Sequence, residues 1–239
     1  MRNINKVLWI GIAIAQLAIV GAQAATLTYQ LDNGTISGAL NASDGTEPLD
    51  NWFANEFTAV TTNAIVGVQF GLDTTAPNTV ADVVLYRQST LQGYTRIYTQ
   101  AFTPLTGNNG TNYFLQTVWL NTPQKLNVGD DFLVAIFVQN VIGLGPNDKY
   151  PMLLDTSGSG GGSWWDRSAP NTFNLDNLSG AAPVTQALAP DGSGAAAYIP
   201  GANHLVIRAF IPEPSVFALG GLAAFGATVL AWRRRSARS

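Results

Sequence analysis

The histidine and cysteine content of this 239-residue chain restricts the chemistry that it can perform. There is one histidine, His204, and no Gly-x-Ser-x-Gly motif that would supply a serine nucleophile for a histidine-based triad. Zinc sites built from His and Cys are excluded, because the chain has a single His and no Cys. We therefore expect His204 to have no catalytic or metal-binding role.

Carboxylates are the second kind of side chain that could do chemistry. Glycoside hydrolysis needs two of them facing each other across a cleft. Residues 25–211 hold 14 acidic side chains, and the sequence singles out no pair. Asp130 and Asp131 are adjacent, so in a strand they would point to opposite faces, and we interpret them as a turn. We expect no enzymatic activity, with a secreted hydrolase as the weaker alternative.

Calcium would need clustered oxygen ligands in loops. The loop acids of the right type are Asp32, Asp44, Asp155 and Asp166. None lies in a twelve-residue EF-hand loop, and Asp is also a common turn former. No cofactor and no metal site is predicted, and calcium at these loops is left open.

Aromatic platforms could bind carbohydrate. Outside the two termini the chain has four tryptophans: Trp52, Trp119, Trp164 and Trp165. Adjacent strand residues face opposite ways, so one of Trp164 and Trp165 should be core and the other outward. An outward Trp beside Asp166 is the candidate ligand site. The alternative is a Trp that packs under the long loop predicted at 169–203.

The elements that must position these side chains are β-strands. Runs rich in Val, Ile, Thr, Phe and Tyr alternate with Gly, Asn, Pro and Asp clusters, and no helical period is sustained between residues 25 and 210. Residues 132–138 are all apolar, which predicts a central strand buried on both faces.

Three local expectations can be tested directly. Asn33-Gly34 predicts a hairpin between strands at 26–31 and 35–40. Residues 52–60 have an irregular apolar pattern, which predicts a segment lying partly across the end of a sheet. Pro123 is expected to end the strand that begins at 112.

Eight to ten short strands predict an all-β fold, a two-layer antiparallel β-sandwich. The segments 120–134, Ser163-Trp164-Trp165 and Ile207-Arg208-Ala209 are similar to those of secreted bacterial jelly-roll sandwiches. That resemblance implies a jelly-roll-like domain at 25–210 and names no ligand.

The N-terminus predicts export. Arg2 and Lys6 are followed by an apolar run at 7–20, and Ala22 and Ala24 provide the small residues of a cleavage site. Residues 1–24 therefore read as a signal peptide, helical and removed by signal peptidase. The alternative is a permanent N-terminal anchor.

The C-terminus has three parts in a fixed order. Pro212-Glu213-Pro214 predicts an extended elbow, because each proline restricts its own φ and the residue before it. Residues 216–232 are uncharged and would form a transmembrane helix of roughly 25 Å. Arg233, Arg234 and Arg235 stop transfer and favour the cytoplasm.

This order resembles the PEP-CTERM sorting signal of Gram-negative bacteria, over residues 211–239. The resemblance implies recognition by an exosortase near Pro212-Glu213-Pro214, transient anchoring in the inner membrane, and release to the cell surface or the extracellular matrix. An ordinary C-terminal anchor is the alternative.

Residues 25–211 carry 6 basic and 14 acidic side chains, a formal charge of −8, which argues against nucleic acid as a partner. We expect an exported, non-catalytic protein that associates with extracellular polysaccharide in a biofilm or acts in adhesion. A carbohydrate-binding module with a defined sugar site is the alternative.

Overall fold

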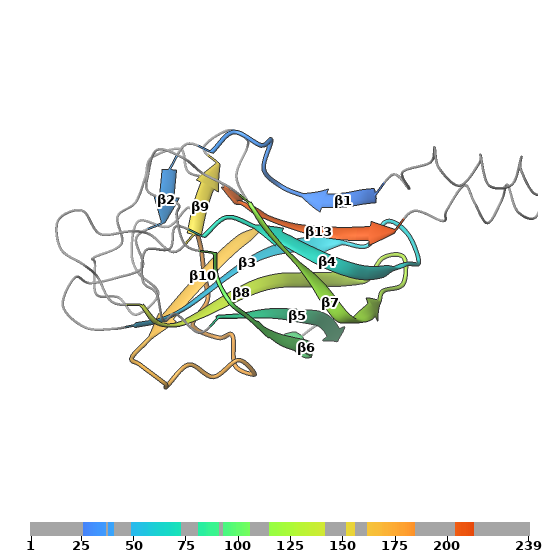
Figure 1. Ribbon diagram of the computed structural model, residues 1–239. Coiled ribbons are helices and arrows are strands. Elements are labelled where there is room, and N and C mark those ends of the chain that lie inside the picture. The colour runs from blue at the N-terminus through green and yellow to red at the C-terminus, as the bar shows by residue number, and fades with distance from the viewer. Residues whose placement is uncertain are drawn as a thin grey trace, which may run out of the picture. The chain divides into compact units, whose positions relative to one another are not determined.

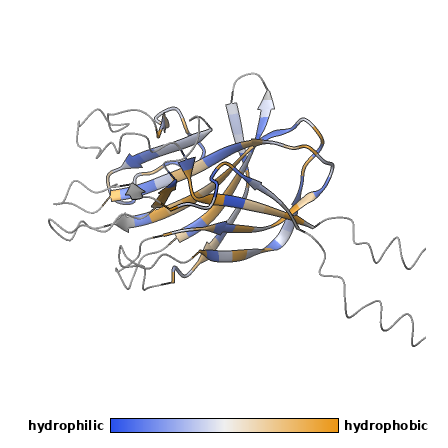
Figure 2. Cartoon of the chain, turned by 90° about the horizontal axis from the view of Figure 1, so that it is seen from above, coloured by the Kyte–Doolittle hydropathy of each residue, from blue (hydrophilic) through white to orange (hydrophobic). Residues whose placement is uncertain are grey.

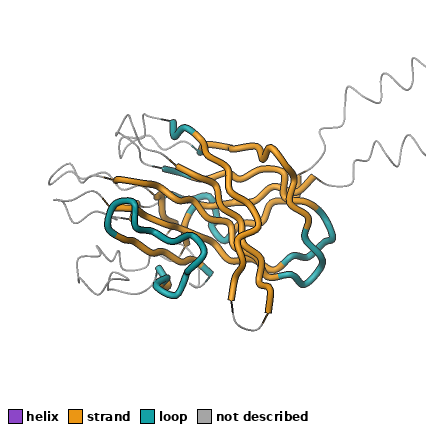
Figure 3. The backbone as a smooth tube through the Cα atoms, turned by 90° about the horizontal axis from the view of Figure 1, so that it is seen from below, coloured by secondary structure: helices purple, strands orange, loops and turns teal. Residues whose placement is uncertain are grey.

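The computed structural model describes residues 26–36, 38–40, 49–72, 81–90, 93–105, 115–141, 152–155, 162–184 and 204–212. No residue in these ranges is helical, and the described chain consists of strands and loops (Figure 3). The predicted all-β class is confirmed. Residues 28–211 form one compact unit, which is the subject of the description below.

The strands lie in three antiparallel sheets (Figure 1). In chain order they are β1 (Thr26–Gln30), β2 (Gly38–Leu40), β3 (Leu49–Thr58), β4 (Ala64–Phe70), β5 (Ala81–Thr90), β6 (Gly93–Phe102), β7 (Gln116–Lys125), β8 (Asp131–Val141), β9 (Met152–Asp155), β10 (Ser163–Ser168), β11 (Ala182–Pro183), β12 (His204–Leu205) and β13 (Ile207–Pro212). A six-stranded sheet has the order β11-β10-β3-β8-β5-β6, a four-stranded sheet the order β1-β13-β4-β7, and a small sheet the order β12-β9-β2.

The central strand of the six-stranded sheet is β8, which pairs with β3 on one side and β5 on the other. Its residues 132–138 are all buried, with at most 3% of any residue exposed. A strand can be apolar at consecutive positions only when both faces are covered, and each fully buried large side chain of this kind contributes roughly 1.5–3 kcal/mol. The predicted central strand is confirmed.

The four-stranded sheet packs on one face of the six-stranded sheet (Figure 1). The Tyr29 ring of β1 lies 5.2 Å from that of Phe132 in β8, and the Phe70 ring of β4 lies 4.9 Å from that of Phe102 in β6. The Asn55 side-chain amide donates to the carbonyl oxygens of Leu205 and Ile207, both at 2.9 Å. The domain is therefore built like a sandwich, and its strands are markedly hydrophobic (Figure 2).

Eight strands pair in a nested pattern once β2 and β9–β12 are set aside. The first pairs with the last, β1 with β13, and the second with the seventh, β3 with β8. The third pairs with the sixth, β4 with β7, and the two middle strands, β5 and β6, pair with each other. The chain thus folds as one long hairpin that alternates between the two sheets.

The hairpin predicted at Asn33-Gly34 is wrong. The turn itself is present: Gly34 has a φ of 89°, and its N–H donates to Asp32 Oδ1 at 3.0 Å. However, β2 pairs with β9 of the small sheet and not with β1. The N–H of Asn33 donates to Asp155 Oδ2 at 2.6 Å, which directs the chain toward β9.

Two other local predictions are also wrong. Residues 49–58 form β3, a long internal strand between β10 and β8, and not a segment across the end of a sheet. Its pattern is irregular because buried polar residues such as Asn55 interrupt the apolar ones. Pro123 lies inside β7 and does not end it; β7 is an edge strand, where a missing N–H is tolerated, and the β4–β7 register shifts nearby.

The predicted signal helix and the predicted transmembrane helix at 216–232 lie outside the described residues. The described residues contain no helix that is long and apolar enough to span a membrane.

Candidate functional site

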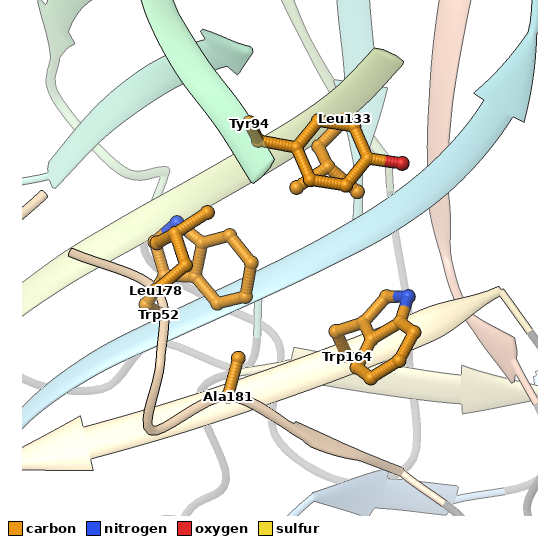
Figure 4. A pocket seen from close by; sticks show the side chains of 6 residues that line it. All are labelled: Trp52, Tyr94, Leu133, Trp164, Leu178 and Ala181. Carbon is orange, nitrogen blue, oxygen red and sulfur yellow. The ribbon is translucent and has the colours of Figure 1, made fainter. Parts of the chain in front are cut away.

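A pocket lies on the face of the six-stranded sheet that points away from the four-stranded sheet. Its volume is about 180 Å³. Three aromatic side chains and three aliphatic ones line it (Figure 4): Trp52, Tyr94, Trp164, Leu133, Leu178 and Ala181. They come from β3, β6, β10, β8 and the loop that follows β10.

Strand alternation and register bring these residues together. In β3 the side chains of Trp52, Ala54 and Glu56 share one face because they are two residues apart. Trp164 pairs directly with Ala54 across the β10–β3 ladder, so its side chain lies on the same face. Trp52 belongs to a buried cluster against which Tyr94 and Trp164 pack.

Glu56 connects two of the aromatic walls. The Tyr94 hydroxyl donates to Glu56 Oε1, and Trp164 Nε1–H donates to Glu56 Oε2 at 3.1 Å. Burial raises the pKa of the Tyr94 hydroxyl, and the hydrogen bond to Glu56 and its negative charge raise it further. Tyr94 therefore stays protonated at all ordinary pH values and remains a donor to the carboxylate.

The indole N–H of Trp52, the third aromatic residue that lines the pocket, has a different hydrogen-bond partner. Trp52 Nε1–H donates to the Tyr86 hydroxyl at 3.2 Å, with the two rings edge to face. Burial also raises the pKa of Tyr86. Each polar atom of the three lining aromatic side chains thus has a partner within the protein.

The loop at 169–184 covers the pocket and the outer face of the sheet around it (orange, below the sheet in Figure 1). Its Phe173 ring lies 5.2 Å from that of Phe137, and its Asp176 forms an ion pair of 2.9 Å with Arg96 of β6. Gly180 lies against the Asp166 carboxylate, where an added Cβ would be 2.7 Å from Oδ2. The loop then joins the sheet as β11, which pairs with β10.

The three residues predicted to bind a ligand lie in different environments. Trp165 is only 1% exposed and points to the inner face, and Asp166 is 8% exposed with Oδ1 accepting the N–H of Arg167 at 2.8 Å. Trp164 is the outward tryptophan and, like Leu178 and Ala181 of the loop, packs against the buried cluster that contains Trp52. One core and one outward Trp were predicted, and the structure assigns which is which. Ligand binding by these residues stays a prediction.

Trp119 is the exposed aromatic residue of the opposite face. It lies on the edge strand β7, is 62% exposed, and its ring centroid is 5.9 Å from that of Phe210 in β13. The ring covers Gly67 of β4, where an added Cβ would lie 2.7 Å from Trp119 Cε3. Gly67 thus lets an indole lie flat on the outer face of the four-stranded sheet.

Sequence analysis did not identify Glu56 and Tyr94 as partners of Trp164. The available signal was the two-residue spacing of Trp52, Ala54 and Glu56, which the irregular strand pattern concealed. Nothing local in the sequence links Tyr94 to Glu56, because the two residues are 38 positions apart.

Two of the remaining candidate residues, Asp32 and Asp155, form contacts within the fold. The Asp32 carboxylate forms an ion pair with Arg208 and receives hydrogen bonds of 3.1 Å from Arg208 Nε. Asp155 holds the N–H of Asn33. His204 is 8% exposed in β12. Among the described residues no group of three or more His, Cys, Asp or Glu could hold a metal ion, and Asp44 lies outside those residues.

Pro212 ends β13, while Glu213, Pro214 and the arginines at 233–235 lie outside the described residues, as do Ala22 and Ala24. Comparison with curated proteins gave no significant match, and comparison with solved structures gave none. The PEP-CTERM protein-sorting motif matches residues 210–235, which confirms the sorting signal predicted from the sequence. The motif indicates an exported protein that is anchored in the membrane before an exosortase sorts it.

Proposed function

We propose that the protein is a non-catalytic component of the cell surface or extracellular matrix, released by an exosortase and associated with extracellular polysaccharide. The observation that carries this proposal is the sorting motif at 210–235. A chain that is exported and then cut from its anchor functions outside the cell, and the part that remains is the β-sandwich.

The position of the motif supports this proposal. Its first residues belong to β13, an internal strand of the four-stranded sheet that ends at Pro212, and Ile211 is fully buried. A protease binds its substrate as an extended chain, so residues held in the sheet are poor substrates. We therefore infer that the exosortase cuts after Pro212 and leaves β13 intact.

We also infer that the domain is a jelly roll. The nested pairing of eight strands, with two sheets of alternating strands, supports this interpretation. The structural use of Asp32, Glu56 and Asp155 supports the non-catalytic assignment, because each carboxylate holds a partner within the fold.

Processing can be tested in an exosortase-containing host. Replacing Pro212, Glu213 and Pro214 by alanine should leave export intact but prevent trimming, so that mass spectrometry finds the peptide 216–239 on the variant and not on the wild type. Pro123→Ala, which changes a proline of an edge strand, is the matched control and should be trimmed normally. If wild type and triple variant both keep the tail, the segment is an ordinary anchor.

The exposed indole of Trp119 favours a second candidate, a carbohydrate-binding module that stacks sugar rings on the outer face of the four-stranded sheet. The flat Trp119 ring beside Phe210 supports it. Co-sedimentation with the host's own extracellular polysaccharide should be lost in Trp119→Ala. Val128→Ala, at another exposed apolar residue, is the control, and equal binding of all three proteins would contradict this candidate.

A further inference from the structure

The covered pocket has an unusual combination of walls. Trp52, Tyr94 and Trp164 reach it from three different strands, and their rings surround one space (Figure 4). Leu133 and Leu178 contribute aliphatic surface between them. Its volume of about 180 Å³ is below the roughly 300–1,000 Å³ of pockets that hold drug-sized ligands, so it would fit one small group.

The hydrogen bonds of the walls exclude a hydroxyl-rich occupant. Trp164 Nε1–H and the Tyr94 hydroxyl donate to Glu56, and Trp52 Nε1–H donates to Tyr86. A sugar in this pocket would lose its bonds to water and find no free donor on these rings, which is costly. The chemistry of the pocket therefore favours an occupant whose surface is apolar.

The charge beside the pocket favours a cation. Glu56 lies where the polar ends of Tyr94 and Trp164 meet, and no ion pair in the described part of the chain joins it to a basic residue. Arg96, a basic residue two positions from Tyr94 in β6, is paired with Asp176. Aromatic faces attract cations through their quadrupoles, and a carboxylate adds to that attraction.

We propose that this pocket, formed by Trp52, Tyr94 and Trp164 with the Glu56 carboxylate hydrogen-bonded to the last two, binds a quaternary or alkylated ammonium group. Such a group has an apolar surface and a positive charge, which are the two properties that the walls select. The proposal does not depend on the function of the sorting signal or on polysaccharide binding by Trp119.

Calorimetric titration of the full chain in maltoside micelles tests the proposal. Choline chloride should bind saturably, and 3,3-dimethylbutan-1-ol, which has the same shape without the charge, should bind at least about tenfold more weakly. Equal binding of the two compounds, or no binding of choline, would overturn the proposal.

Variants locate the site. Glu56→Gln keeps the size of the side chain and removes its charge, so choline affinity should fall by about tenfold with little change for the neutral alcohol. Trp164→Leu should weaken both ligands, and Trp119→Leu, on the opposite face, should weaken neither. Thermal melts confirm that each variant is folded, and a folded Glu56→Gln variant with unchanged choline affinity would contradict the proposal.

The source of the ammonium group is distinguished by phosphocholine. If it binds as tightly as choline, the pocket admits a lipid headgroup. If it binds more weakly than choline, a free or polymer-linked ammonium compound is the natural ligand. Either result supports an ammonium site, provided that the neutral alcohol binds weakly.

Discussion

The six-stranded and the four-stranded sheet of this domain differ in how far the aromatic residues on their outer faces are exposed. The outer face of the six-stranded sheet carries a buried cluster that includes Trp52, Tyr86 and Phe137, and the loop at 169–184 covers it. The outer face of the four-stranded sheet presents Trp119, which is 62% exposed. Both faces carry aromatic residues, yet among the described residues only the face of the six-stranded sheet has a covering segment.

The difference shows that an aromatic residue on a strand has no fixed meaning in the sequence. Trp52 is buried because a segment more than a hundred residues further along the chain folds over the sheet that contains it. Trp119 lies on the edge strand β7 and is 62% exposed, and Gly67, which has no side chain, leaves room for its ring on the outer face. The covered face would hold a small group, and the open face offers a flat surface.

A tryptophan-to-alanine substitution on each face gives the largest expected difference in stability between the two faces. Trp52→Ala should cost about 3–5 kcal/mol, because it leaves a cavity and removes the partner of the Tyr86 hydroxyl. Trp119→Ala should cost about 1 kcal/mol or less, because the ring is largely in water already. Urea unfolding followed by far-ultraviolet circular dichroism measures both. Equal costs would mean that the loop does not protect the covered face.

Glycine substitutions give a second, smaller contrast. Gly180→Ala would place a Cβ 2.7 Å from a carboxylate oxygen of Asp166, a side chain that also accepts the N–H of Arg167 and has little room to move. We expect a loss of about 1–3 kcal/mol. Gly67→Ala would contact the Trp119 ring at the same distance, but that ring can turn into water, so stability should stay within about 1 kcal/mol of the wild type.

Urea midpoints of the two glycine variants provide the measurement. A Gly67→Ala variant that loses more stability than Gly180→Ala would show that the Trp119 ring is fixed in place, and the open face would then be more rigid than its exposure indicates.

The contact between the loop at 169–184 and the sheet can be weakened without removing a buried side chain. Arg96→Ala removes the ion pair with Asp176, whose side chain is 62% exposed, and should cost about 0.2–1 kcal/mol. Hydrogen exchange should become faster at residues 174–181, and 1 M salt should reduce the difference. Arg87→Ala, which breaks the half-buried pair with Asp130, is the control and should leave the loop's exchange unchanged.

The sequence was sufficient for features that depend on local pattern. The apolar run at 132–138 predicted a strand buried on both faces, because no other arrangement covers seven consecutive apolar side chains. The parity of Trp164 and Trp165 predicted that they point to opposite faces. Both inferences need only the geometry of one strand.

Features that depend on distant contacts could not be predicted. Asn55 interrupts the apolar pattern of β3. A buried amide at this position is tolerated because it donates hydrogen bonds to the carbonyl oxygens of Leu205 and Ile207, which are about 150 residues away in the sequence. Pro123 was expected to end a strand, and nothing local indicates that this strand is an edge. The pocket needs the β10–β3 register to place Trp164 beside Ala54, and it needs Leu178 of the covering loop.

The smallest effect concerns Asp82, which pairs with Phe137 across the β5–β8 ladder and lies at the border of the covered face. Burial raises the pKa of Asp82 above its ordinary value of 3.8, and the Arg96 guanidinium partly opposes the rise. The folded state therefore binds this proton more tightly than the unfolded state, so stability decreases as pH rises from 3.8 through the folded pKa.

Asp82→Asn removes the ionisable group and with it this pH dependence. Asp82 is half-buried, so solvent screens part of the penalty, and the variant should gain about 0.5 kcal/mol or less at pH 7. Near pH 3, where the carboxyl group is protonated in both states, the two proteins should have the same stability. Unfolding midpoints at the two pH values measure the difference. A variant less stable than the wild type at pH 7 would mean that the attraction of Asp82 to Arg96 outweighs the effect of burial.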